Sequence, residues 1–199
     1  MPTAEKFDRI SQVAGMAALG IVLSGCGSMS PAAMAKLSGL DPMSVEPGHL
    51  AVAAIMPVPL RLRTGDAVLK VKSDAPAPYG PIDLTLPLEI ISGDSAPGVS
   101  ANSETERVQI GRIAQADLEK LKAAQLRIKA YQASGKTGAK GSFTVGIQGG
   151  CKDGAIGEGP LIAAIAMRTA PGEDFFPMLK SVDLRKLAGE EALAKLPAC

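Results

Sequence analysis

Residues 82–90 carry the pattern that most limits how this chain can fold, a strict alternation of apolar and polar side chains. The apolar members of this alternation are Ile82, Leu84, Leu86, Leu88 and Ile90. Because successive side chains of a strand point to opposite faces, this spacing gives one buried face and one face in water. Strands of this kind are typical of antiparallel sheets. Pro87 cannot donate to a strand ladder, so we expect an edge or a bulge there.

Several other segments have the length and the apolar content of strands. Two alternating runs, 60–63 and 68–72, flank the Gly-Asp turn within 64–67 and predict a β-hairpin. Further strands are expected at residues 50–56, 107–113, 142–148, 161–167 and 176–184. The distribution of these runs along the chain predicts a protein built mainly from strands.

The hydrophobic period changes over residues 115–134, which contain many good helix formers and neither glycine nor proline. One stripe of the predicted helix would hold Leu118, Leu121, Gln125, Ile128 and Tyr131. Gly135 follows as a C-terminal cap, and a short terminal helix is expected at 187–196. The predicted fold is mainly β within the α+β class, an antiparallel sheet or a β-sandwich with one long helix covering part of it.

The first 26 residues have the features of an export signal. Lys6 and Arg9 precede an apolar run at 13–23, and small residues follow this run. The run is shorter than the roughly 20 apolar residues that a membrane-spanning helix requires. We therefore expect an exported protein that does not cross the membrane with this segment.

The stretch Leu23-Ser24-Gly25-Cys26 resembles the lipobox of bacterial lipoproteins. The resemblance implies cleavage between Gly25 and Cys26 by signal peptidase II, with palmitate or a similar acyl group on Cys26. Gly27 stands after the cysteine where an aspartate would imply retention in the inner membrane, so the resemblance implies the outer membrane, facing the periplasm. The expected organisation is a signal peptide at 1–25, a flexible tether at 26–48 and a single β-rich domain at 49–199.

Two cysteines, Cys151 and Cys199, remain when Cys26 is assigned to the lipid. Export to an oxidising compartment allows them to pair. The predicted disulfide would close a loop of about 49 residues and stabilise the fold by roughly 4 kcal/mol on the chain-entropy model. We expect it to hold the C-terminus in place.

Charge and aromatic content exclude some classes of partner. The chain has a formal net charge of +1 and 3% aromatic residues, which argues against general nucleic-acid binding and base stacking. Basic residues would nevertheless share the wet face of the predicted hairpin, and they form a candidate anion-binding face: Arg61, Arg63, Lys70 and Lys72. The alternative is a solvated strand face whose charges are neutralised by Asp83 and Glu89 on the next strand.

No pattern in the sequence predicts catalytic residues, a metal site or a cofactor. His49 is the single histidine, and no Gly-x-Ser-x-Gly elbow accompanies it. We predict a lipid-anchored envelope protein with a non-catalytic binding or assembly role. Its expected partners are the membrane, through the lipid, and an envelope protein, with no nucleic acid.

Two alternative functions stay open. A periplasmic carrier of lipid or another apolar ligand would need a cavity of a few hundred cubic ångström between helix and sheet. Its lining would include Leu84, Leu86, Val145 and Ile165. An envelope hydrolase would need His49 within about 2.6–3.2 Å of a serine and a carboxylate.

The lipobox predicts that Cys26 carries the acyl group. Radiolabelled palmitate should enter the wild-type protein in its native host and should not enter Cys26→Ser, while Ser28→Ala keeps the label. A wild-type protein without label, or cut at another bond, contradicts this prediction.

Overall fold

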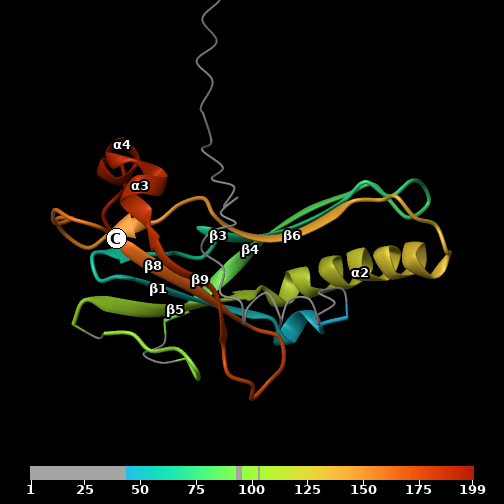
Figure 1. Ribbon diagram of the computed structural model, residues 1–199, viewed down its shortest axis with the longest axis horizontal. Helices are drawn as coiled ribbons and strands as arrows, with labels where there is room; N and C mark the ends of the chain where they lie inside the picture. Colours follow the sequence, from blue (N-terminus) through green and yellow to red (C-terminus); the bar gives the residue numbers. More distant parts are fainter. Residues whose placement is uncertain (1–43, 93–95, 103) are drawn as a thin grey trace, which may run out of the picture.

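The computed structural model describes residues 44–92, 96–102 and 104–199, and its central element is a seven-stranded sheet (Figure 1). The strands are β1 (Ala51–Pro57), β3 (Ala67–Ser73), β4 (Ile82–Ser92), β5 (Glu106–Ile113), β6 (Gly141–Ile147), β8 (Ile162–Arg168) and β9 (Phe176–Asp183). They lie in the order β6-β3-β4-β5-β1-β8-β9, and every neighbouring pair is antiparallel. The predicted mainly β class is confirmed, in the form of a sheet with one long helix.

The predicted hairpin between 60–63 and 68–72 is wrong. The first run forms the short strand β2 (Leu60–Arg61), which pairs with β7 (Cys151–Lys152) in a separate two-stranded sheet. The second run forms β3, whose two edges are already occupied by β4 and β6. A buried glutamine holds the chain after β2: the Leu62 N–H donates to Gln109 Oε1 at 2.8 Å, and Gln109 Nε2 donates to Leu62 O at 2.9 Å.

The alternation over β4 is confirmed, since Ile82, Leu86 and Leu88 are buried while Asp83 and Glu89 are exposed. β4 nevertheless lies inside the sheet and not at its edge. Its first half, as far as Pro87, pairs with β3, and residues 88–92 pair with β5. Pro87 therefore lies where β4 changes partner, and this is the local reason that a residue without an N–H is tolerated within an inner strand.

Strand β1 is buried on both faces, which explains why its apolar run does not alternate with polar residues. Val52, Ala54 and Met56 belong to the larger of two core clusters. Ala51, Ala53 and Ile55 belong to a second cluster on the opposite side, which Ala96 and Phe175 also join from the loops. β1 is thus the strand around which both clusters are packed.

The predicted long helix is confirmed as the turn η2 (Gln115–Asp117) followed by α2 (Leu118–Ala133), and Gly135 follows it with a φ of +71°. The expected stripe faces inward: Leu121, Gln125 and Tyr131 are buried, and Leu118 and Ile128 are partly buried. At the start of the described chain, Gln125 Nε2 donates to Val45 O at 2.8 Å, beside the turn η1 (Pro47–His49).

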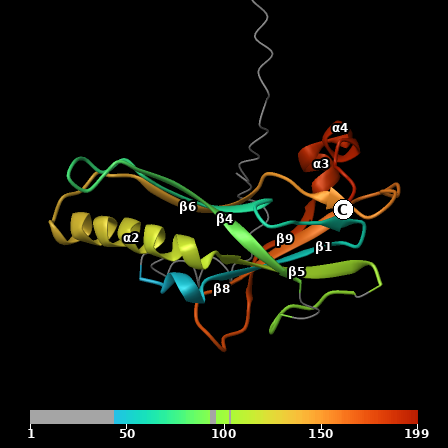
Figure 2. The same cartoon turned by 180° about the vertical axis from the view of Figure 1, so that it is seen from behind.

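The predicted terminal helix at 187–196 is in fact two short helices, α3 (Leu184–Ala188) and α4 (Glu190–Ala194). Gly189 separates them with a φ of +81°, a left-handed conformation that ends one helix and lets the next begin at a different angle. Figures 1 and 2 place the α3–α4 pair at one end of the sheet, while α2 lies beside the ribbon of β3, β4 and β6 at the other end.

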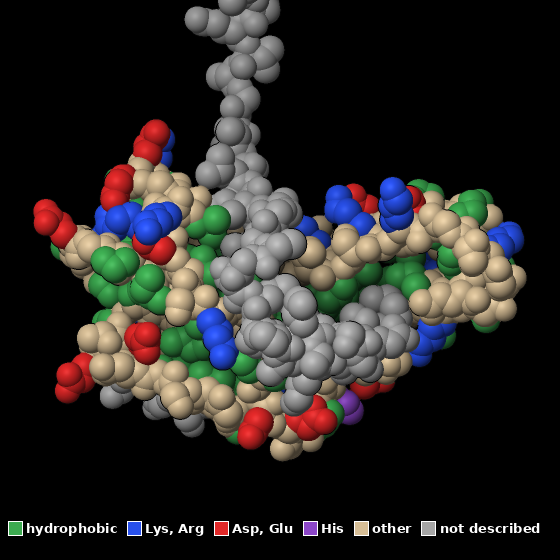
Figure 3. Space-filling model, viewed as in Figure 1, with side chains coloured by type: hydrophobic (Ala, Val, Ile, Leu, Met, Phe, Trp, Pro, Cys, Tyr) green, Lys and Arg blue, Asp and Glu red, His purple; other side chains and the backbone are tan. Residues whose placement is uncertain are grey.

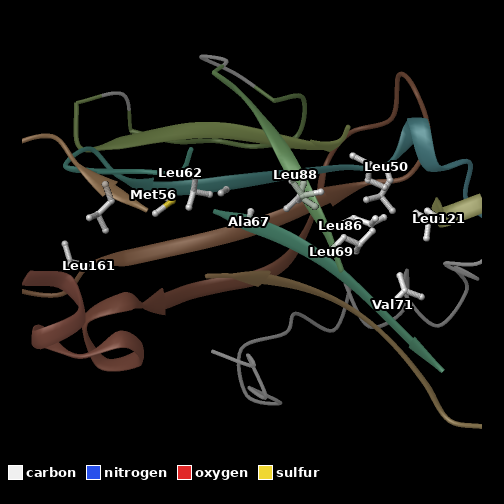
Figure 4. Close-up of a cluster of buried hydrophobic side chains, with 14 of the residues drawn as sticks. Leu50, Met56, Leu62, Ala67, Leu69, Val71, Leu86, Leu88, Leu121 and Leu161 are labelled. Atoms are coloured by element: carbon white, nitrogen blue, oxygen red, sulfur yellow. The ribbon is translucent and has the colours of Figure 1, made fainter. Parts of the chain in front are cut away.

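The larger core cluster extends from α2 along the sheet toward α3 and α4 (Figure 4). Leu69 and Leu86 lie close together in its middle, Leu121 of α2 lies at one end, and Met56 and Leu161 lie toward α3 and α4. Leu69 and Leu121 are fully buried. Leucine side chains therefore pack the core beside Leu121, at the start of α2.

The fold predicts a large cost for truncating Leu69, which is 0% exposed. Leu69→Ala should lower the free energy of unfolding by about 2–5 kcal/mol, because it removes apolar contacts and leaves a cavity. The matched control is Leu126→Ala on α2, where the side chain is 67% exposed and the loss should stay within about 0.5 kcal/mol. Equal losses in chemical denaturation would contradict this core assignment.

Candidate binding cavity

An apolar cavity of about 250 Å³ lies between the sheet and the C-terminal helices α3 and α4. Met56 of β1 and Ile165 of β8 line it from the sheet, and Leu179 of β9 lines it at the sheet's edge. Leu187 of α3 and Leu193 of α4 line the opposite wall. Figure 3 shows hydrophobic side chains gathered below these two helices. This cavity is the strongest candidate for a binding site among the described residues.

Small side chains on both walls account for the space. β1 and β8 contribute Ala54, Ala163 and Ala164, and the helices contribute Ala188 and Ala192. Close packing normally leaves few voids larger than a water molecule. An alanine methyl group fills less of the space between two packed walls than a leucine side chain does. Ala54 of β1 and Ala163 and Ala164 of β8 therefore contribute to this space.

A disulfide closes one side of the cavity. Cys151 and Cys199 are bonded, with their Cα atoms 5.0 Å apart, as the sequence predicted. Cys151 itself lines the cavity. Two backbone bonds reinforce the link: the Lys152 N–H donates to Pro197 O at 2.9 Å, and the Cys199 N–H donates to Lys152 O at 3.1 Å. Together they hold the segment after α4 against β7.

The polar part of the lining is concentrated where β2 meets the loop before β7, and it includes Arg61 and Gln148. Arg61 Nε lies 2.8 Å from Asp153 Oδ2, and Arg107 Nη2 of β5 lies 3.6 Å from the same oxygen. Gln148 Nε2 donates to Gly65 O at 3.3 Å. This mouth is thus polar and cationic, in contrast to the rest of the lining.

The four residues of the predicted anion-binding face do not share one hairpin. Arg61 belongs to the β2–β7 pair and lies at the cavity mouth. Arg63 pairs with Asp66 at 3.1 Å, and this hydrogen bond and the carboxylate charge raise the pKa of Arg63. Lys70 lies on β3 opposite Thr85 and Thr144.

The prediction that Asp83 and Glu89 of the next strand neutralise these basic residues is correct for Asp83 and wrong for Glu89. Lys72 Nζ lies 3.0 Å from Asp83 Oδ2, directly across the β3–β4 pair. Glu89 lies opposite Arg112 of β5 instead, because β4 has changed partner by that point.

The space that the carrier alternative expects between the long helix and the sheet is present, but its predicted lining is wrong. Of its four predicted lining residues, Ile165 lines the observed cavity, whereas Leu86 is buried in the filled core beside Leu69. A separate hollow of about 320 Å³ does lie between α2 and strands β3 and β6. Lysine and serine side chains share its lining with Ile128 and Phe143, so it is less apolar. Neither space is lined by Leu84.

The remaining sequence predictions concern His49 and the lipobox. His49 is exposed within η1, where its N–H donates to Glu46 O at 2.9 Å. This position gives the hydrolase alternative no support. Gly25 and Cys26 lie outside the described residues.

The described part of the chain contains no group of three potential metal ligands and no helix that is long and apolar enough to cross a bilayer. Comparisons with protein-family models, with curated proteins and with solved structures each return no match.

Three features of this site have no counterpart among the sequence predictions: Arg107, Asp153 and the alanines that line the cavity. The alanine-rich runs 51–54 and 162–166 were the available signal, because large residues usually fill the interior of a sheet. The sequence could not predict that Arg61, Arg107 and Asp153 lie close together, since they come from three separate segments.

The disulfide should stabilise the fold and hold the cavity wall. The double variant Cys151→Ser/Cys199→Ser should lose roughly 4 kcal/mol of unfolding free energy and should be cut by protease in the segment after α4. The intact mass of the unreduced protein should be lower than that of the reduced protein by two hydrogens. Free thiols titrating at both cysteines of the untreated protein would contradict the bond.

Proposed function

We propose that this protein is a lipid-anchored protein of the cell envelope that binds an apolar ligand in the cavity below α3 and α4. The role is non-catalytic binding, and the ligand is an apolar chain. The observation that supports this proposal is a cavity lined by aliphatic side chains from both sheet and helices, with its polar residues at one end. Concave, mostly apolar sites with a few placed polar groups are typical of small-ligand binding.

The size of the cavity sets the size of the ligand. A water molecule occupies about 30 Å³ of liquid, and a methylene group is similar, so 250 Å³ accommodates a chain of about eight methylenes. Burying eight methylenes at about 0.8 kcal/mol each contributes roughly 6 kcal/mol before the costs of association. Before those costs, about 6 kcal/mol corresponds to a dissociation constant between millimolar and micromolar, and the costs of association weaken the binding by the chain alone.

The lipid anchor and the cavity support one another in this proposal. Acylation of Cys26 would hold the domain beside a bilayer, where apolar chains are concentrated. The cavity then receives a ligand from the membrane or delivers one to it, which is the carrier form of the same function. An envelope protein remains the expected partner, and a pull-down from detergent-solubilised membranes tests it.

Filling the cavity tests the proposed function. The probe is a ten-carbon alcohol with a photoreactive diazirine, applied to the full-length protein in nanodiscs of zwitterionic phospholipid. Ala192→Leu on α4 should reduce labelling of residues 184–196 about tenfold, because the larger side chain enters the cavity and displaces roughly two methylenes. The control is Ala194→Leu, on the same helix but exposed and outside the lining.

Equal labelling of the wild type and of both variants would show that the alcohol does not enter the cavity. The proposed function would then be wrong. Thermal unfolding of each variant confirms that a loss of labelling is not a loss of fold.

A further inference from the structure

We propose that the ligand of this cavity is a single-chain carboxylic acid, whose carboxylate is bound at the mouth by Arg61 while its chain enters the cavity. This inference rests on the proposed function and adds the chemistry of the headgroup. The evidence for the headgroup is the group of charged side chains around Asp153. An apolar ligand alone gives these charges no role.

Arg61 is placed at the boundary between the cavity and the solvent. Its backbone is fixed by the pairing of β2 with β7, opposite Cys151. Its side chain lines the cavity and is 47% exposed, so its guanidinium is accessible from the mouth. A planar guanidinium presents two parallel N–H groups that match the two oxygens of a carboxylate.

Two guanidiniums share one carboxylate at the mouth. Asp153 is the carboxylate that both Arg61 and Arg107 approach, at 2.8 Å and 3.6 Å. Two cations around one anion leave one positive charge. Asp66, a nearby carboxylate on the turn before β3, is itself paired with Arg63.

The Arg107 side chain lacks a hydrogen-bond acceptor for one of its buried donors. Its Nε is buried and has no hydrogen-bond partner among the described residues. Buried donors are normally satisfied, and an exception calls for an explanation. Arg107 Nη2 lies 3.6 Å from Asp153 Oδ2, beyond a direct hydrogen bond, whereas Arg61 Nε lies 2.8 Å from the same oxygen. An added carboxylate at Arg61 would let Asp153 turn toward Arg107.

The contrast between mouth and interior orients the ligand. A carboxylate placed deep among Met56, Leu179 and Leu193 would be buried without partners, which costs several kcal/mol more than leaving it at the mouth. A chain of about eight methylenes behind a carboxylate at Arg61 fills the volume described above. Decanoic acid has this composition, and 1-decanol is its uncharged counterpart.

The test compares these two compounds as competitors of the photoreactive alcohol, on the full-length protein in zwitterionic nanodiscs. Decanoate should compete at a lower concentration than decanol with the wild type. Arg61→Gln should raise the half-inhibitory concentration of decanoate about tenfold, the scale of one charge-assisted hydrogen bond, and leave decanol unchanged. The control Arg63→Gln removes a neighbouring cation that is paired with Asp66 and does not line the cavity, and it should change neither value.

Asp153→Asn gives an independent test with the opposite sign. It removes the competing carboxylate and frees both guanidiniums, so decanoate should compete at a concentration several-fold lower, with decanol unchanged. A loss of fold cannot produce tighter binding of one ligand alone.

Three outcomes would overturn the proposal. Equal competition by acid and alcohol in the wild type, or an equal loss of both in Arg61→Gln, rules out the carboxylate while the cavity function stands. An effect of Arg61→Gln that appears with anionic phospholipid nanodiscs and not with decanoate assigns the cluster to a membrane surface. Absence of labelling in the cavity by any compound removes the proposed function itself.

Discussion

Burial of β1 on both faces is the constraint on which the rest of the structure depends. Strand β1 pairs with β5 on one side and β8 on the other, and its side chains enter two separate core clusters. A strand in this position must be apolar throughout, and its alanines limit how much of each cluster it can fill. The leucines of β3, β4 and α2 fill the interior at one end of the sheet. At the other end alanines are among the residues that line the apolar cavity below α3 and α4.

The cavity is thus a consequence of how the segment after β9 packs on the sheet. After β9 the chain turns back over the sheet as α3 and α4, and Gly189 sets the angle between them. The Cys151–Cys199 bond and the backbone bonds at Lys152 hold the last residues against β7. The same two-stranded pair positions Arg61 at the mouth. The short β2–β7 pair therefore both stabilises the cavity wall and positions the Arg61 guanidinium.

The hydrophobic pattern of the sequence predicted most helices and strands of this fold, but it did not predict which strands pair with one another. The alternation at 82–90, the helix at 115–134 and the disulfide needed only spacing and the chemistry of each residue type. The hairpin at 60–72 failed because pairing depends on which edges are free, and Gln109, distant in sequence, holds the chain at Leu62. A hollow does lie beside the predicted helix, but the apolar cavity below α3 and α4 was not predicted, because its lining comes from segments far apart in the sequence. The Arg61–Asp153–Arg107 cluster arises from three segments and was beyond any local signal.

Xenon binding tests the central claim, an accessible apolar cavity below α3 and α4, most directly. Xenon enters dry cavities lined by aliphatic side chains, and it has no hydrogen bonds to make. In a crystal of the protein under xenon pressure, the account predicts a xenon atom between Met56, Ile165 and Leu193. A xenon-free site whose walls have closed, with α3 and α4 packed directly on the sheet, would contradict it.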